Sequence, residues 1–172
     1  MPYIILIIAS VIILIYLAYT FFIRPSIANK KINSQVENYF NAKGYKIIDN
    51  NKLYDKLVIN EDEKIYLKYV LVPANSQITI NCKEKWKLSW GGSSAKVGRA
   101  YPNHRYLKEV EEFALKEMDG KKVFIIYPTT EHILRYINEC ELETIDINKT
   151  PYGYKLVRFD HFGEEMDTCI NN

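Results

Sequence analysis

The chain opens with an apolar run over residues 3–23 that contains no charged side chain. A helix of these 21 residues rises about 1.5 Å per residue and spans roughly 30 Å, the thickness of a bilayer's hydrocarbon core. Tyr19, Phe21 and Phe22 close the run and suit the lipid–water interface. The pattern predicts a transmembrane anchor at residues 1–24, so the membrane is the first expected partner of the chain.

A cleaved signal peptide and a helix buried in a partner protein are the alternatives to an anchor. Secretory signals begin with a basic segment and end at small residues. Here no Lys or Arg precedes the run and its end is aromatic, which favours an uncleaved anchor. Arg24, Lys30 and Lys31 follow the run, so the positive-inside rule places the remaining chain in the cytoplasm, held at the cell membrane. Pro25 is expected to end the first helix, with residues 25–32 as a juxtamembrane connector.

Residues 33–172 are enough for one domain with a hydrophobic core. Its first helix is predicted at residues 34–43, where apolar positions recur at helical spacing, with Ser34 as N-cap and Gly44 at the end. Alternating polar and apolar positions then predict extended segments. These are residues 46–48, 53–59, 64–72 and 77–90, followed further along by 143–147 and 154–159.

Three more segments complete the pattern. Residues 122–127 form a continuous apolar strand of the kind that is buried on both faces. Residues 102–118 and 131–139 carry apolar side chains at helical spacing and are predicted to be helices, with Pro102 in the first turn of one and Thr130 capping the other. Helices and strands in this order are typical of an α/β domain built on a single mixed sheet.

The order of elements and four local features carry a resemblance to a known family. The features are residues 36–40 followed by 43–48, Asp55 in the next strand, the strand Ile65-Tyr66-Leu67-Lys68, and Trp86 and Trp90 followed by residues 102–105. Over residues 34–147 the chain resembles the restriction-endonuclease-like superfamily. Within it, the nuclease-related domain and the modification-dependent restriction enzymes are the most similar.

The resemblance implies a Mg²⁺ ion held between carboxylates and a lysine that orients or activates the attacking water. It implies catalytic roles for Glu37, Asp55 and Lys68, with Glu37 and Asp55 as the metal ligands. The family also places an acid two residues before the lysine, because residues i and i+2 of a strand share a face. Tyr66 stands there, and a phenol is a poor Mg²⁺ ligand. A degenerate site is therefore predicted.

Charge is unevenly spread along a chain whose net charge is +2. Residues 83–108 hold seven basic side chains and one acid, Glu84. With the aromatic side chains between them, these cations suit nucleic acid, a protein partner or anionic lipid headgroups. The alternative is that the lysines only cover the solvent face of a strand whose Trp86 and Leu88 point inward. The candidate binding residues are Lys83, Lys85, Lys87, Lys96, Arg99 and Arg105.

Three hypotheses follow from these patterns. The first is a single-pass membrane protein whose cytosolic, nuclease-like domain is a non-catalytic binding or adaptor module. The second is a membrane-tethered, Mg²⁺-dependent nuclease that recruits its missing acid from elsewhere in the chain. The third is a structural membrane protein with an unrelated α/β domain. No zinc-type Cys/His spacing and no phosphate-binding glycine loop is present in the sequence.

Overall fold

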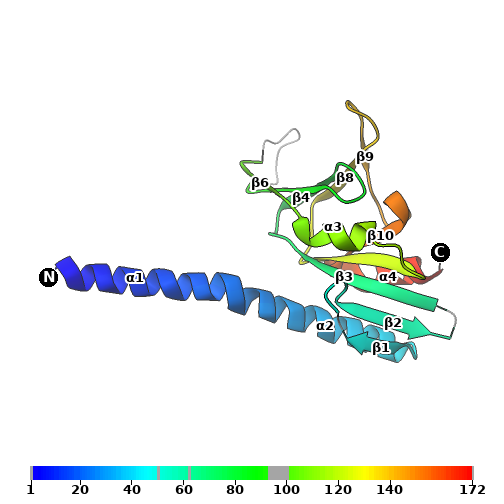
Figure 1. Ribbon diagram of the computed structural model, residues 1–172, viewed down its shortest axis with the longest axis horizontal. Coiled ribbons are helices and arrows are strands. Elements are labelled where there is room, and N and C mark those ends of the chain that lie inside the picture. The colour runs from blue at the N-terminus through cyan, green and yellow to red at the C-terminus, as the bar shows by residue number, and fades with distance from the viewer. Residues whose placement is uncertain (1, 50, 62, 93–100, 172) are drawn as a thin grey trace. The chain divides into compact units, whose positions relative to one another are not determined.

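The computed structural model describes residues 2–49, 51–61, 63–92 and 101–171 (Figure 1). The chain divides into two compact units, Met1–Val36 and Glu37–Asn172. Helical backbone runs through three successive elements: α1 (Pro2–Ala18), the π-helical turn η1 (Tyr19–Ile23) and α2 (Arg24–Ala42). Within the described part of the chain, none of the helices has both the length and the apolar character that crossing a bilayer requires.

The prediction that Pro25 ends the first helix is wrong. Residues 25–32, expected as a connector, and Ser34, expected as an N-cap, lie inside α2. A proline is excluded from a helix interior because it lacks an N–H and crowds the carbonyl four residues earlier. Pro25 is only the second residue of α2, and it follows the wider turn of η1, where the N–H of Arg24 bonds the carbonyl of Tyr19.

Gly44 ends α2 as its sequence position predicts. Its φ is +76°, a left-handed conformation that glycine adopts without a Cβ clash. The N–H of Gly44 bonds the carbonyl of Asn41, and the N–H of Tyr45 bonds the carbonyl of Phe40. The chain is thereby turned directly into the first strand.

The larger part of the predicted strand pattern forms one five-stranded sheet, sheet A. Its order is β1 (Lys46–Asp49), β2 (Lys56–Asn60), β3 (Glu63–Leu71), β7 (Lys121–Tyr127) and β10 (Tyr154–Arg158). The first three strands are antiparallel, whereas β3, β7 and β10 run parallel. Residues 123–126 of β7 are fully buried, which confirms the prediction of a strand covered on both faces.

The prediction of a single mixed sheet is only partly right, because a second sheet, sheet B, accompanies the first. Its order is β6 (Asn103–Tyr106), β5 (Trp86–Trp90), β4 (Ser76–Ile80), β8 (His132–Tyr136) and β9 (Leu142–Thr144). β4 runs parallel to β8, and the other neighbours are antiparallel. The domain is α/β with two mixed sheets (Figure 1).

Two predicted helices are replaced wholly or partly by strands of sheet B. Residues 103–106 form β6 along β5, and the helix that follows, α3 (Lys108–Leu115), is shorter than expected. Residues 132–136 form β8 between β4 and β9, although a helix capped by Thr130 was expected there. The Thr130 hydroxyl instead donates to the carbonyl of Ser76 at 2.8 Å and ties the start of β8 to β4. Pairing with neighbouring strands overrides the local helical pattern in both segments.

The core of the domain lies between the two sheets and α3. Trp86 of sheet B and Tyr154 of sheet A are both fully buried, and the Trp86 indole N–H donates to the Tyr154 hydroxyl at 3.1 Å. Phe124 packs against both rings, with centroids 4.5 and 5.1 Å away, and against Phe113 of α3 at 4.9 Å. The remaining elements are η2 (Pro151–Gly153), η3 (Phe159–His161) and α4 (Phe162–Asn171), which contacts β10.

A buried lysine caps the end of α3. Lys122 of β7 donates from Nζ to three carbonyl oxygens at the C-terminal end of α3, those of Phe113, Ala114 and Lys116, at 2.9, 2.6 and 3.0 Å. Carbonyls at a helix end have no partner within the helix, and a cation there also suits the helix dipole. Burial, helped by the charge of Lys83, lowers the pKa of Lys122 from 10.5 to about 8.

Replacing Lys122 should therefore give a pH-dependent loss of stability. Because the pKa of Lys122 lies below its unfolded value, the unfolded chain binds more protons between about pH 8 and pH 10.5. The wild-type free energy of unfolding should then rise with pH across this window, relative to Lys122→Met. Urea unfolding of both proteins at several pH values measures the difference. A difference that stays flat from pH 8 upward would contradict this assignment.

Candidate functional site

The structure brings together two of the three residues predicted to form a nuclease site. Asp55 stands directly before β2, and its N–H bonds the carbonyl of Leu67 in β3 at 2.8 Å. One carboxylate oxygen, Oδ2, lies 3.7 Å from the Lys68 ammonium and accepts a hydrogen bond of 2.7 Å from the N–H of Tyr69. Asp55 and Lys68 are thus cross-strand neighbours that form a half-buried ion pair.

Glu37, the third predicted residue, makes a different contact. Its Oε1 accepts a hydrogen bond of 2.7 Å from Nζ of Lys56, which also donates to Asp49. Lys56 pairs with Leu67 in the strand register, next to Lys68. Consecutive strand residues point to opposite faces, so Lys56 and Lys68 leave sheet A on opposite sides. The structure therefore gathers Glu37 with Lys56 and not with Lys68.

The Glu37, Lys56 and Asp49 cluster has a clear structural role. Only 7% of the Lys56 side chain is exposed, and a buried ammonium is costly unless carboxylates compensate it. Burial works against its charged form, but the hydrogen bonds to Asp49 and Glu37 outweigh this and raise its pKa. The two carboxylates thereby keep a buried cation charged inside the fold.

Tyr66 stands two residues before Lys68, where the resemblance implies an acid, and it is also hydrogen-bonded. Its hydroxyl donates to Asp119 Oδ1 at 2.6 Å, and Asp119 accepts a second bond from Lys64. The bond to Asp119, with some burial, raises the pKa of Tyr66 to about 12, while Lys64 and Tyr66 lower that of Asp119 to about 2. Among the described residues, no group of three or more His, Cys, Asp or Glu side chains is placed to hold a metal ion.

The predicted basic block is spread over different surfaces. Lys87 of β5 pairs with Tyr106, whereas Arg105 pairs with Leu88 and so leaves sheet B on the opposite face. Arg105 binds Glu109 through two hydrogen bonds of 2.8 and 3.2 Å. Lys83 and Lys85 belong to the turn between β4 and β5, and Lys96 and Arg99 lie outside the described residues. Trp86 and Leu88 are fully buried, as the alternative interpretation of this block expects.

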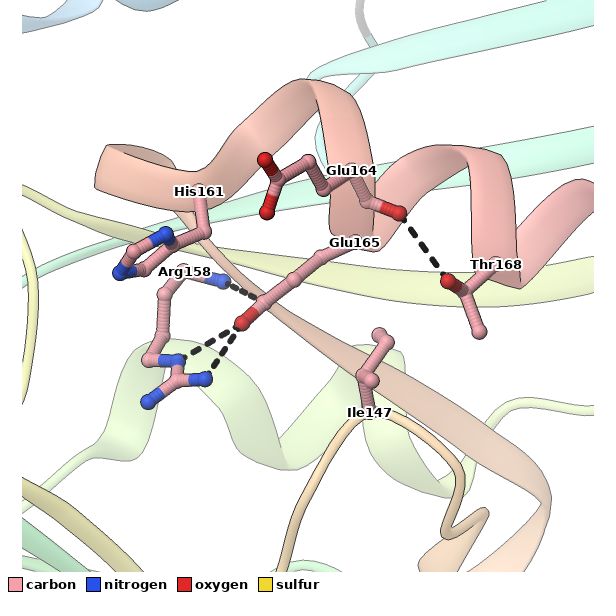
Figure 2. A pocket seen from close by; sticks show the side chains of 6 residues that line it. All are labelled: Ile147, Arg158, His161, Glu164, Glu165 and Thr168. Atoms are coloured by element: carbon pink, nitrogen blue, oxygen red, sulfur yellow. Dashed lines mark hydrogen bonds and ion pairs between the residues drawn. The ribbon is translucent and has the colours of Figure 1, made fainter.

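Two hollows among the described residues are candidate binding sites, and the first lies against β10 and α4. It has a volume of about 290 Å³ and contains the side chains shown in Figure 2. Glu165 Oε1 accepts bonds of 2.8 and 2.6 Å from the Arg158 guanidinium, and its Oε2 accepts the Arg158 N–H at 2.6 Å. The Thr168 hydroxyl donates to the carbonyl of Glu164. The bonds between Arg158 and Glu165 join β10 to α4, so these two side chains are already paired with each other.

The second hollow, of about 400 Å³, lies on the face of sheet B that is turned away from the core. We call this surface the open face. Its floor contains the buried hydroxyls of Thr79 and Ser89, and the side chain of Gln77 donates to Thr79 at 3.3 Å. The side chains that line it are Gln77, Thr79, Asn81, Lys87, Ser89, Tyr101, His104, Tyr106, Tyr136 and Leu142.

Sequence reasoning did not find the open face as a site. The polar positions of residues 77–81 and 87–89 were expected on one side of extended chain. Tyr106 and Tyr136, however, fall in segments that were predicted to be helical, so nothing placed them on the same sheet. Comparisons of the chain with protein families, with curated proteins and with solved structures found no match.

Proposed function

We propose that this chain is a membrane-anchored binding protein whose α/β domain has a nuclease-like architecture without nuclease activity. The proposed lack of nuclease activity rests on one observation, the separation of the predicted catalytic residues. Lys68 is paired with Asp55, whereas Glu37 compensates Lys56 on the other side of sheet A. In the resembling nucleases these groups act on one metal ion, which requires them to share a site.

The nuclease-like part of the proposal rests on the order of elements in the Glu37–Asn172 unit. After the end of α2 come three antiparallel strands, then α3, then the buried strand β7 beside β3. Apart from sheet B, this order agrees with the predicted one as far as β7, whereas residues 132–136, within the predicted helix 131–139, form β8. The strands of sheet B lie in the chain between β3 and α3 and after β7, and β5 and β6 contain Trp86, Trp90 and residues 103–105, which are part of the resemblance.

The anchoring part of the proposal rests on the apolar run. Apolar residues surround α1 on every side and continue through η1, so that helical backbone carries the whole of residues 3–23. A helix that is apolar on all sides is usually buried, either in a protein core or in lipid. Arg24, Lys30 and Lys31 follow on the same chain and favour a cytoplasmic domain.

A Mg²⁺-dependent nuclease is the second candidate, favoured by the contact between Asp55 and Lys68. A cleavage assay distinguishes the two candidate functions. Single- and double-stranded nucleic acids are incubated with the full chain and Mg²⁺. We expect wild type to cleave no more than Asp55→Ala does. The matched control is Glu61→Ala, an exposed acid in the turn after β2. Cleavage that survives in Glu61→Ala but is abolished in both Asp55→Ala and Lys68→Ala would establish the nuclease instead.

A further inference from the structure

The open face of sheet B is organised in rows that cross four strands. One row contains Tyr106 of β6, Lys87 of β5, Thr79 of β4 and Leu134 of β8. Residues opposite one another in a ladder share a face, so these side chains lie on one surface. Tyr136 follows Leu134 by two positions and lies on the same surface. The opposite face of these strands is buried, as the full burial of Trp86 shows.

The side chains of the open face are aromatic, amide, hydroxyl or basic. Tyr106 and Tyr136 are 52% and 40% exposed, a large solvent exposure for aromatic rings. Among the described residues that line the hollow, Lys87 carries an ammonium group and none carries a carboxylate. Glu131 lies at the margin, where it accepts a hydrogen bond of 3.2 Å from the Tyr101 hydroxyl. The surface therefore suits a ligand that combines flat apolar rings, hydrogen-bonding edges and negative charge.

We propose that the open face binds single-stranded nucleic acid. Tyr106 and Tyr136 offer their rings to two unpaired bases, and Lys87 between them attracts the phosphate backbone. The strands of Tyr106 and Tyr136 are three ladder spacings apart, about 14 Å, which leaves room for bases at both ends of the hollow. The amides of Gln77 and Asn81 are suited to bond base edges that lie between them.

A single strand fits this surface better than a duplex. Bases in a duplex are stacked on each other and present only their edges, so the tyrosine rings would have no base face to bind. Duplex binding depends on several phosphate contacts, and the described residues that line the open face include one lysine, Lys87. This inference rests on the proposed function, because it identifies the partner class of the binding domain.

Binding is tested with fluorescein-labelled oligouridylate and oligothymidylate of roughly 12 nucleotides. Full-length protein is held in neutral phosphatidylcholine nanodiscs with EDTA, and fluorescence anisotropy reports the affinity. Tyr106→Ala and Tyr136→Ala should each weaken binding about tenfold. Lys87→Gln should weaken binding and lower the slope of log K against log salt by about 0.7. Tyr106→Phe keeps the ring and should restore most of the affinity.

Two control variants match the altered residues elsewhere on the domain. Tyr152→Ala removes a tyrosine that is 40% exposed like Tyr136 but contacts Arg135, on the opposite face of sheet B. Lys52→Gln removes an exposed lysine before β2. Both should bind like wild type. Equal losses in Tyr152→Ala and Tyr136→Ala, a preference for duplex, or no binding of either oligonucleotide would overturn the inference.

Parallel samples that contain Mg²⁺ in place of EDTA distinguish failure of this inference from failure of the proposed function. The oligonucleotides are recovered after incubation with Mg²⁺ and sized on a gel. Shortened products together with tyrosine-dependent binding would keep the open-face site and overturn the non-catalytic function. Intact oligonucleotides without binding would overturn the site and leave a non-catalytic domain for another class of partner.

Discussion

Gly120→Ala should destabilise the domain by about 3 kcal/mol. Gly120 stands directly before β7, where the chain runs against β3. A Cβ added there would lie 2.3 Å from the carbonyl oxygen of Lys64 and 2.8 Å from its Cβ. Real atoms do not approach so closely, so the backbone of β3 or β7 must move, and their parallel pairing begins at the next residue, Ile65 with Lys121. The constraint is the close approach of two backbones at the centre of sheet A.

The destabilisation is measured by urea unfolding, followed by circular dichroism, and should lower the midpoint by roughly 1–2 M. Gly163→Ala is the matched control. Its Cβ would have nothing within 4 Å, and it lies in the first turn of α4. Alanine loses less backbone entropy than glycine, so this variant should be unchanged or up to about 1 kcal/mol more stable. Equal midpoints for the two variants would mean that β3 and β7 do not meet at Gly120.

Most of sheet A could be predicted from sequence because its signals are local or strongly apolar. Residues 123–127 are a continuous apolar run, which is typical of a strand covered on both faces. The alternation in residues 64–72 fixes which side of β3 is buried, and Leu67 is fully buried as expected. Gly44 ends α2 through its own backbone freedom, which needs no information from elsewhere in the chain.

Residues 77–90 and 143–147 of sheet B were predicted to be extended, but β6 and β8 could not be predicted because they depend on strand partners that are distant in sequence. Tyr106 lies on β6 only because β5 is beside it, and Tyr136 lies on β8 only because β4 and β9 enclose it. Apolar residues in these short strands also fit a helical period, and short strands and helices cannot be told apart by periodicity alone. Pro102 and Thr130 suit a strand entrance as well as a helix start.

The candidate site could be predicted only in part, because some of its contacts follow from local strand pairing and others from helix packing. Asp55 and Lys68 are joined by the register of two neighbouring strands, and that register follows from a short turn. Glu37 reaches its partner from a helix, and the face that a helix turns to a sheet is decided by packing that the sequence does not display. The alternation of polar and apolar residues placed Asp55 and Lys68 on neighbouring extended segments but did not give the partner of Glu37.

A lysine pair in the middle of the apolar run should abolish membrane association. Ile12 and Ile13 lie at the centre of residues 3–23, and each lysine at the centre of a spanning helix costs about 2.5–3.5 kcal/mol. The combined cost of Ile12→Lys with Ile13→Lys is therefore about 5–7 kcal/mol. We expect the wild-type chain to stay with sedimented membranes after alkaline carbonate extraction and the double variant to move to the supernatant.

The control for this experiment must add the same charge at apolar positions outside the run. Ile48 and Ile137 are exposed isoleucines of the Glu37–Asn172 unit. Ile48→Lys with Ile137→Lys should therefore leave the chain in the membrane pellet, because neither position enters lipid if residues 3–23 are the anchor. If wild type and both double variants fractionate alike, the apolar run does not hold this protein in a bilayer. Protease added to intact cells then tests the orientation, since a cytoplasmic domain stays uncut while a domain outside the cell is digested.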